Sequence, residues 1–158
     1  MNASDILKYG HLTVTRAVDG LPESDWETPG ACGFWSVKNI IAHLASFEHV
    51  LVEVLAGFVE PMPTPNLDRY TNPSGNFNDG EVEDRAGKSP GETMAEYQEL
   101  QARTMELIGL IPEETRRRPG TLPWYGEEYA LDDFIVYAYY GHKREHCAQI
   151  AVFRDHLG

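Results

Sequence analysis

Three histidines in this sequence have the spacing and surroundings of metal ligands. His142 and His146 are four residues apart in a segment whose apolar pattern is helical, so their side chains share one face, with β-carbons about 6 Å apart. One metal ion can reach both imidazoles from that face. The residue after His142 is Lys143 rather than the Glu of the zinc-protease motif, so the pair does not indicate a zinc protease.

A stable site needs a third ligand, and His43 is the best candidate. It lies between Ile40 and Phe47 in an apolar segment, so we expect it to face the interior. Burying three unpaired imidazoles would destabilise the fold, whereas three imidazoles that share an ion are paired. Such a set suits Zn2+, Ni2+, Cu2+ or Fe2+, with Zn2+ and Ni2+ as first choices, and it leaves a coordination position open for water or substrate.

The pattern of the last segment predicts which of its residues face inward. The inward stripe consists of Ile135, Tyr139, His142, His146, Gln149 and Phe153. Lys143 is expected to point elsewhere. Three residues near the pair are weak catalytic candidates, and the catalytic residue stays unknown. Tyr139 could donate a hydrogen bond, Glu145 could orient His142 or act as a base, and Gln149 lies beside the pair. The alternatives are that Tyr139 and Gln149 only pack or orient a metal ligand through a contact, and that Glu145 is a solvated charge.

The other histidines rank lower as ligands. His11 lies on the predicted inward face of the first helix and could be a fourth ligand or support one. His49 is six residues after His43, roughly 240° around a helix, so it should face away. His156 should be exposed near the end of the last helix. We expect Cys147 to be buried by packing rather than to act as a ligand or a nucleophile.

Four segments carry the 3.6-residue spacing of helices and must position these side chains. They span roughly residues 4–19, 36–56, 89–111 and 132–157. No segment shows sustained strand alternation, so the expected fold is all-α, a four-helix bundle. The intervening stretches are longer than the about 2–8 residues usual in bundles, which allows crossover connections. The middle stretch, 57–88, is rich in Pro, Asn and Gly and is either a mobile loop or a roof over a site.

Composition limits the class of protein. The chain has 158 residues, 42% of them hydrophobic, which suits a single domain over 1–158. Its apolar runs are interrupted before the about 18–20 residues of a membrane span, and it lacks the pattern of a signal peptide, so we expect a soluble, cytoplasmic protein. A formal net charge of -12 opposes a phosphate backbone. We therefore expect a small-molecule substrate, no nucleic acid and no membrane as partners.

Two motifs in this order resemble a known family. Residues 35–44, WSVKNIIAHL, and residues 142–150, HKREHCAQI, together resemble the DinB-like superfamily of metalloenzymes. The resemblance implies a four-helix bundle with long crossover connections. It also implies a metal site built from a His on the second helix and a His-x-x-x-His pair on the fourth, which here are His43, His142 and His146.

The resemblance also suggests what the chain does. Characterised relatives include thiol transferases and isomerases that use mycothiol, bacillithiol or glutathione, and many members respond to stress. It implies a divalent-metal-dependent activity of thiol S-transferase-like or hydrolase-like kind on a small electrophilic substrate, with a low-molecular-weight thiol as a co-substrate in the first case. The alternative is a non-catalytic metal- or ligand-binding stress-response protein. A homodimer is compatible with the resemblance.

Overall fold

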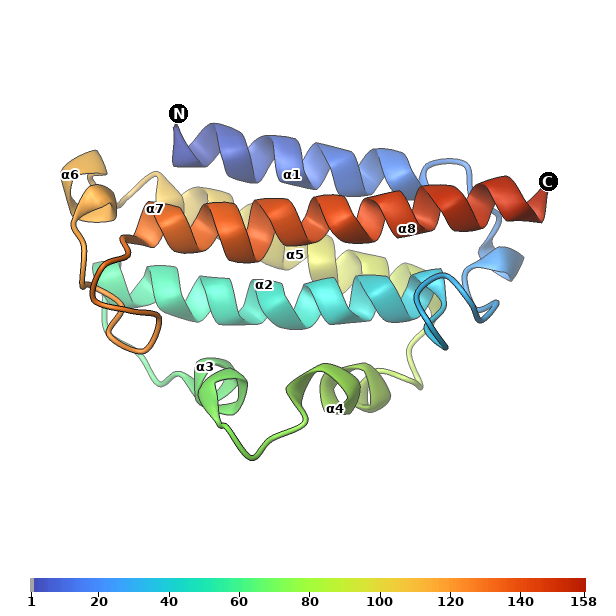
Figure 1. The fold of residues 1–158 in the computed structure, drawn as a ribbon, viewed down its shortest axis with the longest axis horizontal. Helices are drawn as coiled ribbons and strands as arrows, with labels where there is room; N and C mark the ends of the chain where they lie inside the picture. The colour runs from blue at the N-terminus through green and yellow to red at the C-terminus, as the bar shows by residue number, and fades with distance from the viewer. Residues whose placement is uncertain (1) are drawn as a thin grey trace.

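Four long helices lie side by side in a bundle. The computed structural model describes residues 2–158. The long helices are α1 (Ala3–Val18), α2 (Val37–Val59), α5 (Pro90–Ile108) and a final run made of α7 (Leu131–Phe134), η2 (Ile135–Gly141) and α8 (His142–Leu157). As the colours in Figure 1 show, α2 and α5 run in one direction and α1 and α8 in the other. Within residues 2–158, the β structure is limited to an isolated bridge between Cys32 and Trp35. The predicted all-α bundle with crossover connections is confirmed.

Capping residues set where α2 and α5 begin. The Ser36 side chain accepts a hydrogen bond from the backbone of Asn39, and the Asn39 side chain accepts one from the backbone of Ser36. Ser89 and Glu92 form the same reciprocal arrangement at the start of α5, with Pro90 in the first turn. Each capping box satisfies backbone N–H groups that the helix leaves unpaired. The cap of α2 lies two turns before His43 and so fixes the start of the helix that carries it.

Helix α2 is the central element of the bundle. By length and composition it could cross a membrane, which the sequence reasoning did not anticipate. However, 67% of its apolar window is buried inside the protein, as in the core helix of a soluble protein. The apolar character of α2 is therefore explained by its contacts with α5, α8 and the connecting segments.

The last helix departs from α geometry just before the histidine pair. Over Ile135–Gly141 it is a π-helix, a wider form that often occurs near functional sites. Four members of the predicted inward stripe are buried, namely Ile135, Tyr139, His146 and Phe153. The buried face of α8 also includes Lys143, Cys147 and Ile150 beside that stripe. The prediction for Lys143 is therefore wrong. It faces the middle of the bundle, while His142 and His146 lie at the edge next to α2.

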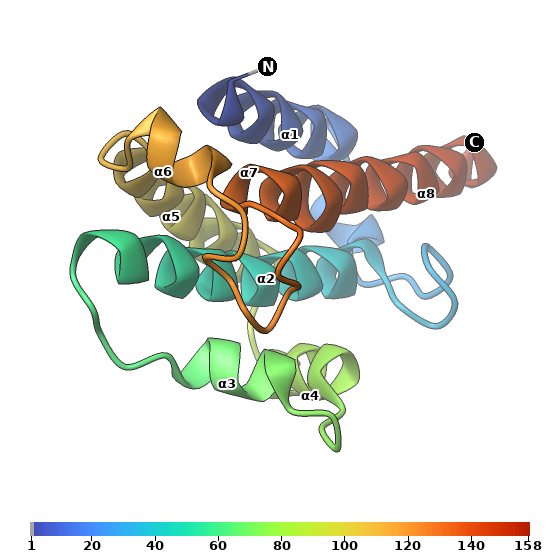
Figure 2. The same ribbon diagram turned by 60° about the vertical axis from the view of Figure 1, so that its left-hand side comes forward.

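The 57–88 stretch forms two short helices rather than an irregular loop. They are α3 (Pro65–Thr71) and α4 (Phe77–Asp84), and both lie against α2 on the side away from α1 (Figure 2). The remaining short elements are η1 (Glu23–Asp25) and α6 (Glu113–Arg117). The 57–88 stretch therefore carries the chain back along α2, so that α5 starts at the same end of the bundle as α2.

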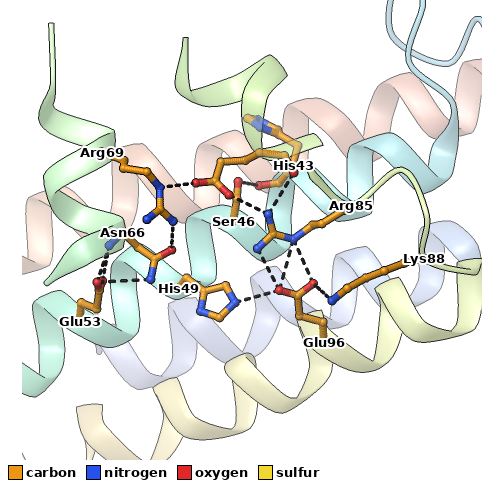
Figure 3. A network of polar contacts seen from close by, with 10 residues as sticks. His43, Ser46, His49, Glu53, Asn66, Arg69, Arg85, Lys88 and Glu96 are labelled. Atoms are coloured by element: carbon orange, nitrogen blue, oxygen red, sulfur yellow. Dashed lines mark hydrogen bonds and ion pairs between the residues drawn. The ribbon is translucent and has the colours of Figure 1, made fainter. Parts of the chain in front are cut away.

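Carboxylates hold α3 and α4 in place. The Glu53 side chain on α2 accepts the backbone N–H of Asn66 at 2.7 Å, in the first turn of α3 (Figure 3). A carboxylate is stabilised there by the unpaired N–H groups at a helix N-terminus. Arg69 on α3 forms an ion pair with Glu81 on α4. These contacts tie both short helices to each other and to α2.

Glu96 on α5 is the centre of a second polar cluster. Its carboxylate accepts hydrogen bonds from Arg85 and Lys88 and is paired with His49 (Figure 3). Arg85 is 9% exposed and also binds Glu81. As expected, His49 faces away from His43, and its partner is this carboxylate. The cluster fixes the end of α4 against α5.

The Glu96 cluster should make stability depend on acidity. Burial would raise the pKa of Glu96, but hydrogen bonds from His49, Arg85 and Lys88 outweigh it and hold the pKa well below its usual range. A carboxyl with a lower pKa in the folded state stabilises the fold above its unfolded pKa and loses that effect on acidification. We expect the free energy of unfolding to fall as the pH drops below about 4.5. In Glu96→Gln, the total fall should be smaller by about 1–2 kcal/mol.

Urea unfolding followed by circular dichroism between about pH 7 and pH 3 measures this dependence. Glu99→Gln is the matched control, because Glu99 is exposed on the same helix. If the free energy of unfolding of Glu96→Gln falls with pH as steeply as that of the unchanged protein, the Glu96 cluster is not the source of the acid dependence.

Candidate metal centre

His43, His142 and His146 converge on one point, as their spacing predicts. His43 lies on α2, and the other two lie in the first turns of α8. The Nε2 atom of His142 is 2.9 Å from Nε2 of His43 and 3.0 Å from Nε2 of His146. The ligand atoms of all three lie within 4.8 Å of one another. Residues almost a hundred positions apart thus present their ring nitrogens to a common centre.

Aromatic rings hold this group in place. The ring of His43, which is 3% exposed, lies between those of Trp35 and Phe47, at centroid distances of 4.9 and 4.8 Å. Phe47 also packs on His142 at 4.6 Å. His146 is buried, whereas His142 is only partly buried. The group is therefore enclosed on the His43 side and open to solvent on the His142 side.

Burial keeps the imidazoles of His43 and His142 neutral. Burial first, and then the neighbouring histidines, lowers the pKa of His43 to about 3. The same causes, together with Lys143, lower the pKa of His142 to about 4. Nδ1 of His146 is 2.8 Å from Oε1 of Gln149, an oxygen that can only accept, so Nδ1 is the donor of this hydrogen bond, and in the neutral ring Nε2 presents a lone pair to the centre.

The donor set fits a divalent cation. Each neutral imidazole has one N–H and one lone pair, so three Nε2 atoms that face one another cannot all be satisfied by their own protons. Two nitrogens bound to one ion at their usual bond lengths can be at most about 4.2 Å apart. The two Nε2 separations from His142 are shorter than this limit, and for His43 and His146 the ligand atoms lie within 4.8 Å of each other. Gln149 supplies the hydrogen bond that commonly orients a ligand histidine. Nδ1 of His43 has no such partner among the described residues, and the flanking rings fix its orientation instead.

The catalytic candidates occupy different surroundings. The Tyr139 hydroxyl donates to the backbone carbonyl of Phe47 at 2.8 Å, and its ring is buried, so it contributes packing. Glu145 is exposed, which suits a solvated charge. Gln149 contacts His146 and so acts through that histidine. Tyr139 and Gln149 thus already have hydrogen-bond partners, and a catalytic role of any of the three stays a prediction.

His11 lies outside the three-histidine group. Its Nδ1 is 3.2 Å from the hydroxyl of Tyr97 on α5, which accounts for its partial burial. His11 as a fourth ligand is not supported by this arrangement. His156 is exposed at the end of α8, as expected.

Sequence reasoning missed a charged pair directly behind the histidines. Lys143 and Glu48 form an ion pair, with side chains that are 2% and 0% exposed. The available signal was Glu48 itself, one of two glutamates in the apolar run of α2, which lies in the middle of that run directly after Phe47. A buried carboxylate needs a partner, but the sequence does not indicate which of the cations supplies it.

The fold and the site define an all-helical bundle with a three-histidine group that could bind a metal ion. The family model of the DinB superfamily matches residues 11–150, so the chain belongs to the DinB superfamily. No curated protein and no solved structure matches it. The resemblance identified from the two histidine motifs is thus confirmed, and the particular reaction has to be inferred from the site.

Cys147 should be an unreactive thiol. Burial raises its pKa to about 11, although the charge of Lys143 opposes this shift. Because the thiolate is the reactive form, we expect iodoacetamide to modify Cys147 on the order of a hundred times more slowly in the folded protein than in urea. Mass spectrometry of the labelled peptides gives both rates. The partly exposed Cys32 is an internal comparison, and equal labelling of the two cysteines in the folded protein would refute the prediction.

Proposed function

We propose that this protein is a divalent-metal-dependent enzyme that transfers a low-molecular-weight thiol to a small electrophilic substrate. The supporting observation is the convergence of three histidine nitrogens at a partly open edge of the bundle. Three protein ligands are typical of catalytic sites, which keep a position free. When bound, an ion such as Zn2+ or Ni2+ supplies Lewis-acid activation of a thiol or a water molecule near neutral pH.

Thiol transfer fits the residues of this chain better than hydrolysis. Within the described residues, the three-histidine group includes no carboxylate, and the nearby Glu145 is exposed. A thiol loses its proton near a pKa of about 8.5, whereas free water needs about 15.7, so a thiol depends less on a protein base. The thiolate sulphur forms the new bond to carbon, and the leaving group departs with the electron pair. Hydrolysis by the same site is the second choice.

Aromatic residues beside His142 suggest the shape of the substrate. Phe47 packs on His142 at 4.6 Å, Tyr70 on Phe47 at 5.4 Å, and Trp124 on Tyr70 at 6.3 Å. All four side chains are partly exposed. Such rings bind flat or apolar groups by stacking. We therefore expect an electrophile that carries an apolar or aromatic part.

The wider setting is also part of the proposal. The net charge of -12 favours a small-molecule partner over nucleic acid, and we place the protein in the cytoplasm. The competing function is a non-catalytic stress-response protein that sequesters a metal ion or a ligand. The two differ in turnover, because a sequestering protein binds the ion but does not accelerate a reaction.

Metal binding should depend on all three histidines. Protein purified without an affinity tag should bind one divalent ion per chain, and His43→Ala, His142→Ala or His146→Ala should each weaken the affinity at least about a hundredfold, since a ligand matters at least as much as its supporting contacts. Elemental analysis and competition with a coloured chelator measure this. His156→Ala, on the same helix but exposed, should bind normally. Full affinity in His43→Ala with unchanged circular dichroism would exclude the site.

Catalysis should require both metal and thiol. We expect the metal-loaded protein to accelerate the reaction of a low-molecular-weight thiol with chlorodinitrobenzene, forming the thioether and chloride, at least about tenfold over the uncatalysed rate. His43→Ala should abolish the acceleration because it removes a ligand. Absorbance of the thioether follows the reaction. If a panel of thiols gives no acceleration while the ion binds tightly, the sequestering function is the correct one.

A further inference from the structure

The buried pair of Lys143 and Glu48 lies at the same level of the bundle as the three histidines. Lys143 follows His142 on α8, and Glu48 follows Phe47, whose ring packs on His142. Both charged side chains are almost fully enclosed, and they form an ion pair with each other. Neither residue belongs to the three-histidine group. The pair therefore joins the two helices that supply the proposed ligands, at the level of those ligands.

The other two long helices close around the same pair. On α5, the Thr104 hydroxyl donates to Oε2 of Glu48 at 3.1 Å, and the ring of Tyr97 lies 5.2 Å from Nζ of Lys143. On α1, Gly10 is so close that an added β-carbon would lie 3.6 Å from Cδ of Lys143. All four long helices of the bundle thus meet at this one ion pair.

A buried ion pair favours the alignment of its helices that keeps its two charges together. Removing either charge from its partner leaves an uncompensated charge in the interior, which is strongly destabilising, whereas apolar side chains tolerate sliding and repacking. A shift of α8 by one turn, about 5.4 Å, would separate Lys143 from Glu48. The same shift would separate His142 and His146 from His43.

Two further features make this alignment important. The π-helix η2 ends immediately before His142. The rotation of α8 about its axis therefore differs from that of an uninterrupted α-helix. In addition, a divalent cation beside His142 would be repelled by the ammonium group of Lys143, and Glu48 offsets that charge. The pair therefore suits a neighbouring cation both in geometry and in net charge.

We propose that Lys143 and Glu48 are positioning residues, which set the register and rotation of α8 against α2 so that the three histidines can share one ion. The proposal rests on the metal binding proposed above. It differs from a purely stabilising role in one respect. Replacing both charges by apolar groups can restore stability, but it cannot restore the alignment that only the charges specify.

The test compares single and double substitutions in the full chain. Lys143→Met and Glu48→Gln should each lower the midpoint of thermal unfolding of the metal-free protein and weaken Zn2+ binding. The double variant Lys143→Met/Glu48→Leu should regain most of the midpoint yet bind Zn2+ at least about tenfold more weakly than the unchanged protein, a loss comparable to that of other contacts that orient metal ligands. Its absorption spectrum with Co2+ should also differ. Arg144→Met, an exposed neighbour on α8, is the control and should bind normally.

Three results would overturn the proposal. A double variant with unchanged Zn2+ affinity and an unchanged Co2+ spectrum would show that the pair only stabilises the fold. If the double variant does not fold, Thr104→Val decides, because it removes the hydrogen bond to Glu48 and keeps both charges. We expect it to bind Zn2+ several-fold more weakly, and full affinity would refute the role. If the unchanged protein binds no metal, the proposed function fails and this inference fails with it.

Discussion

The packing of α2 against α8 at the level of His43 and His142 is the contact on which this structure depends. Apolar helices can pack in several registers at similar free energy. Polar groups buried at the same interface remove this freedom, because each must find its partner. Here the imidazoles and the Lys143–Glu48 pair share one level of the bundle. The imidazoles and the ion pair, which are the most costly groups to bury, are therefore the groups that define how α8 aligns with α2.

The long crossover makes this contact possible. Because α3 and α4 return the chain along α2, α5 runs parallel to α2, and the final helix enters antiparallel beside both. Two glutamates fix the crossover in place. Glu53 accepts a hydrogen bond from the N-terminus of α3, and Glu96 forms an ion pair with Arg85 at the end of α4. The crossover also brings Tyr70 to Phe47, at the edge of the histidine group. A connection that looks like an insertion thus shapes the surroundings of the site.

The chemistry follows from burial. A histidine in water is partly protonated near neutral pH, and a protonated ring cannot bind a metal. Enclosure by Trp35 and Phe47 and the proximity of the other rings lower the pKa values of His43 and His142. The protein thus keeps these two ligands neutral, while Gln149 sets the proton of His146. Neutral nitrogen donors with an open side suit a Lewis-acid ion.

Local rules in the sequence were sufficient for the four long helices and for the three histidines. Capping residues such as Ser36 and Ser89 act on adjacent backbone groups, and the 3.6-residue spacing gave the four long helices and the shared face of His142 and His146. The bias of the 57–88 stretch toward Pro, Asn and Gly hid α3 and α4, because their stability comes from contacts such as Glu53 with Asn66 rather than from local propensity.

Only the tertiary structure decided what surrounds the histidines. Lys143 faces the core, against the prediction that it points elsewhere. Its partner Glu48 lies far away in the sequence. The Trp35 and Phe47 rings are near His43 in the sequence, but only the fold brings Phe47 against His142. The sequence by itself determined which residues could bind a metal, because residue type and helical spacing are local properties. The pairing of buried charges is a property of the packed bundle, because each charge is stabilised by a partner from another helix.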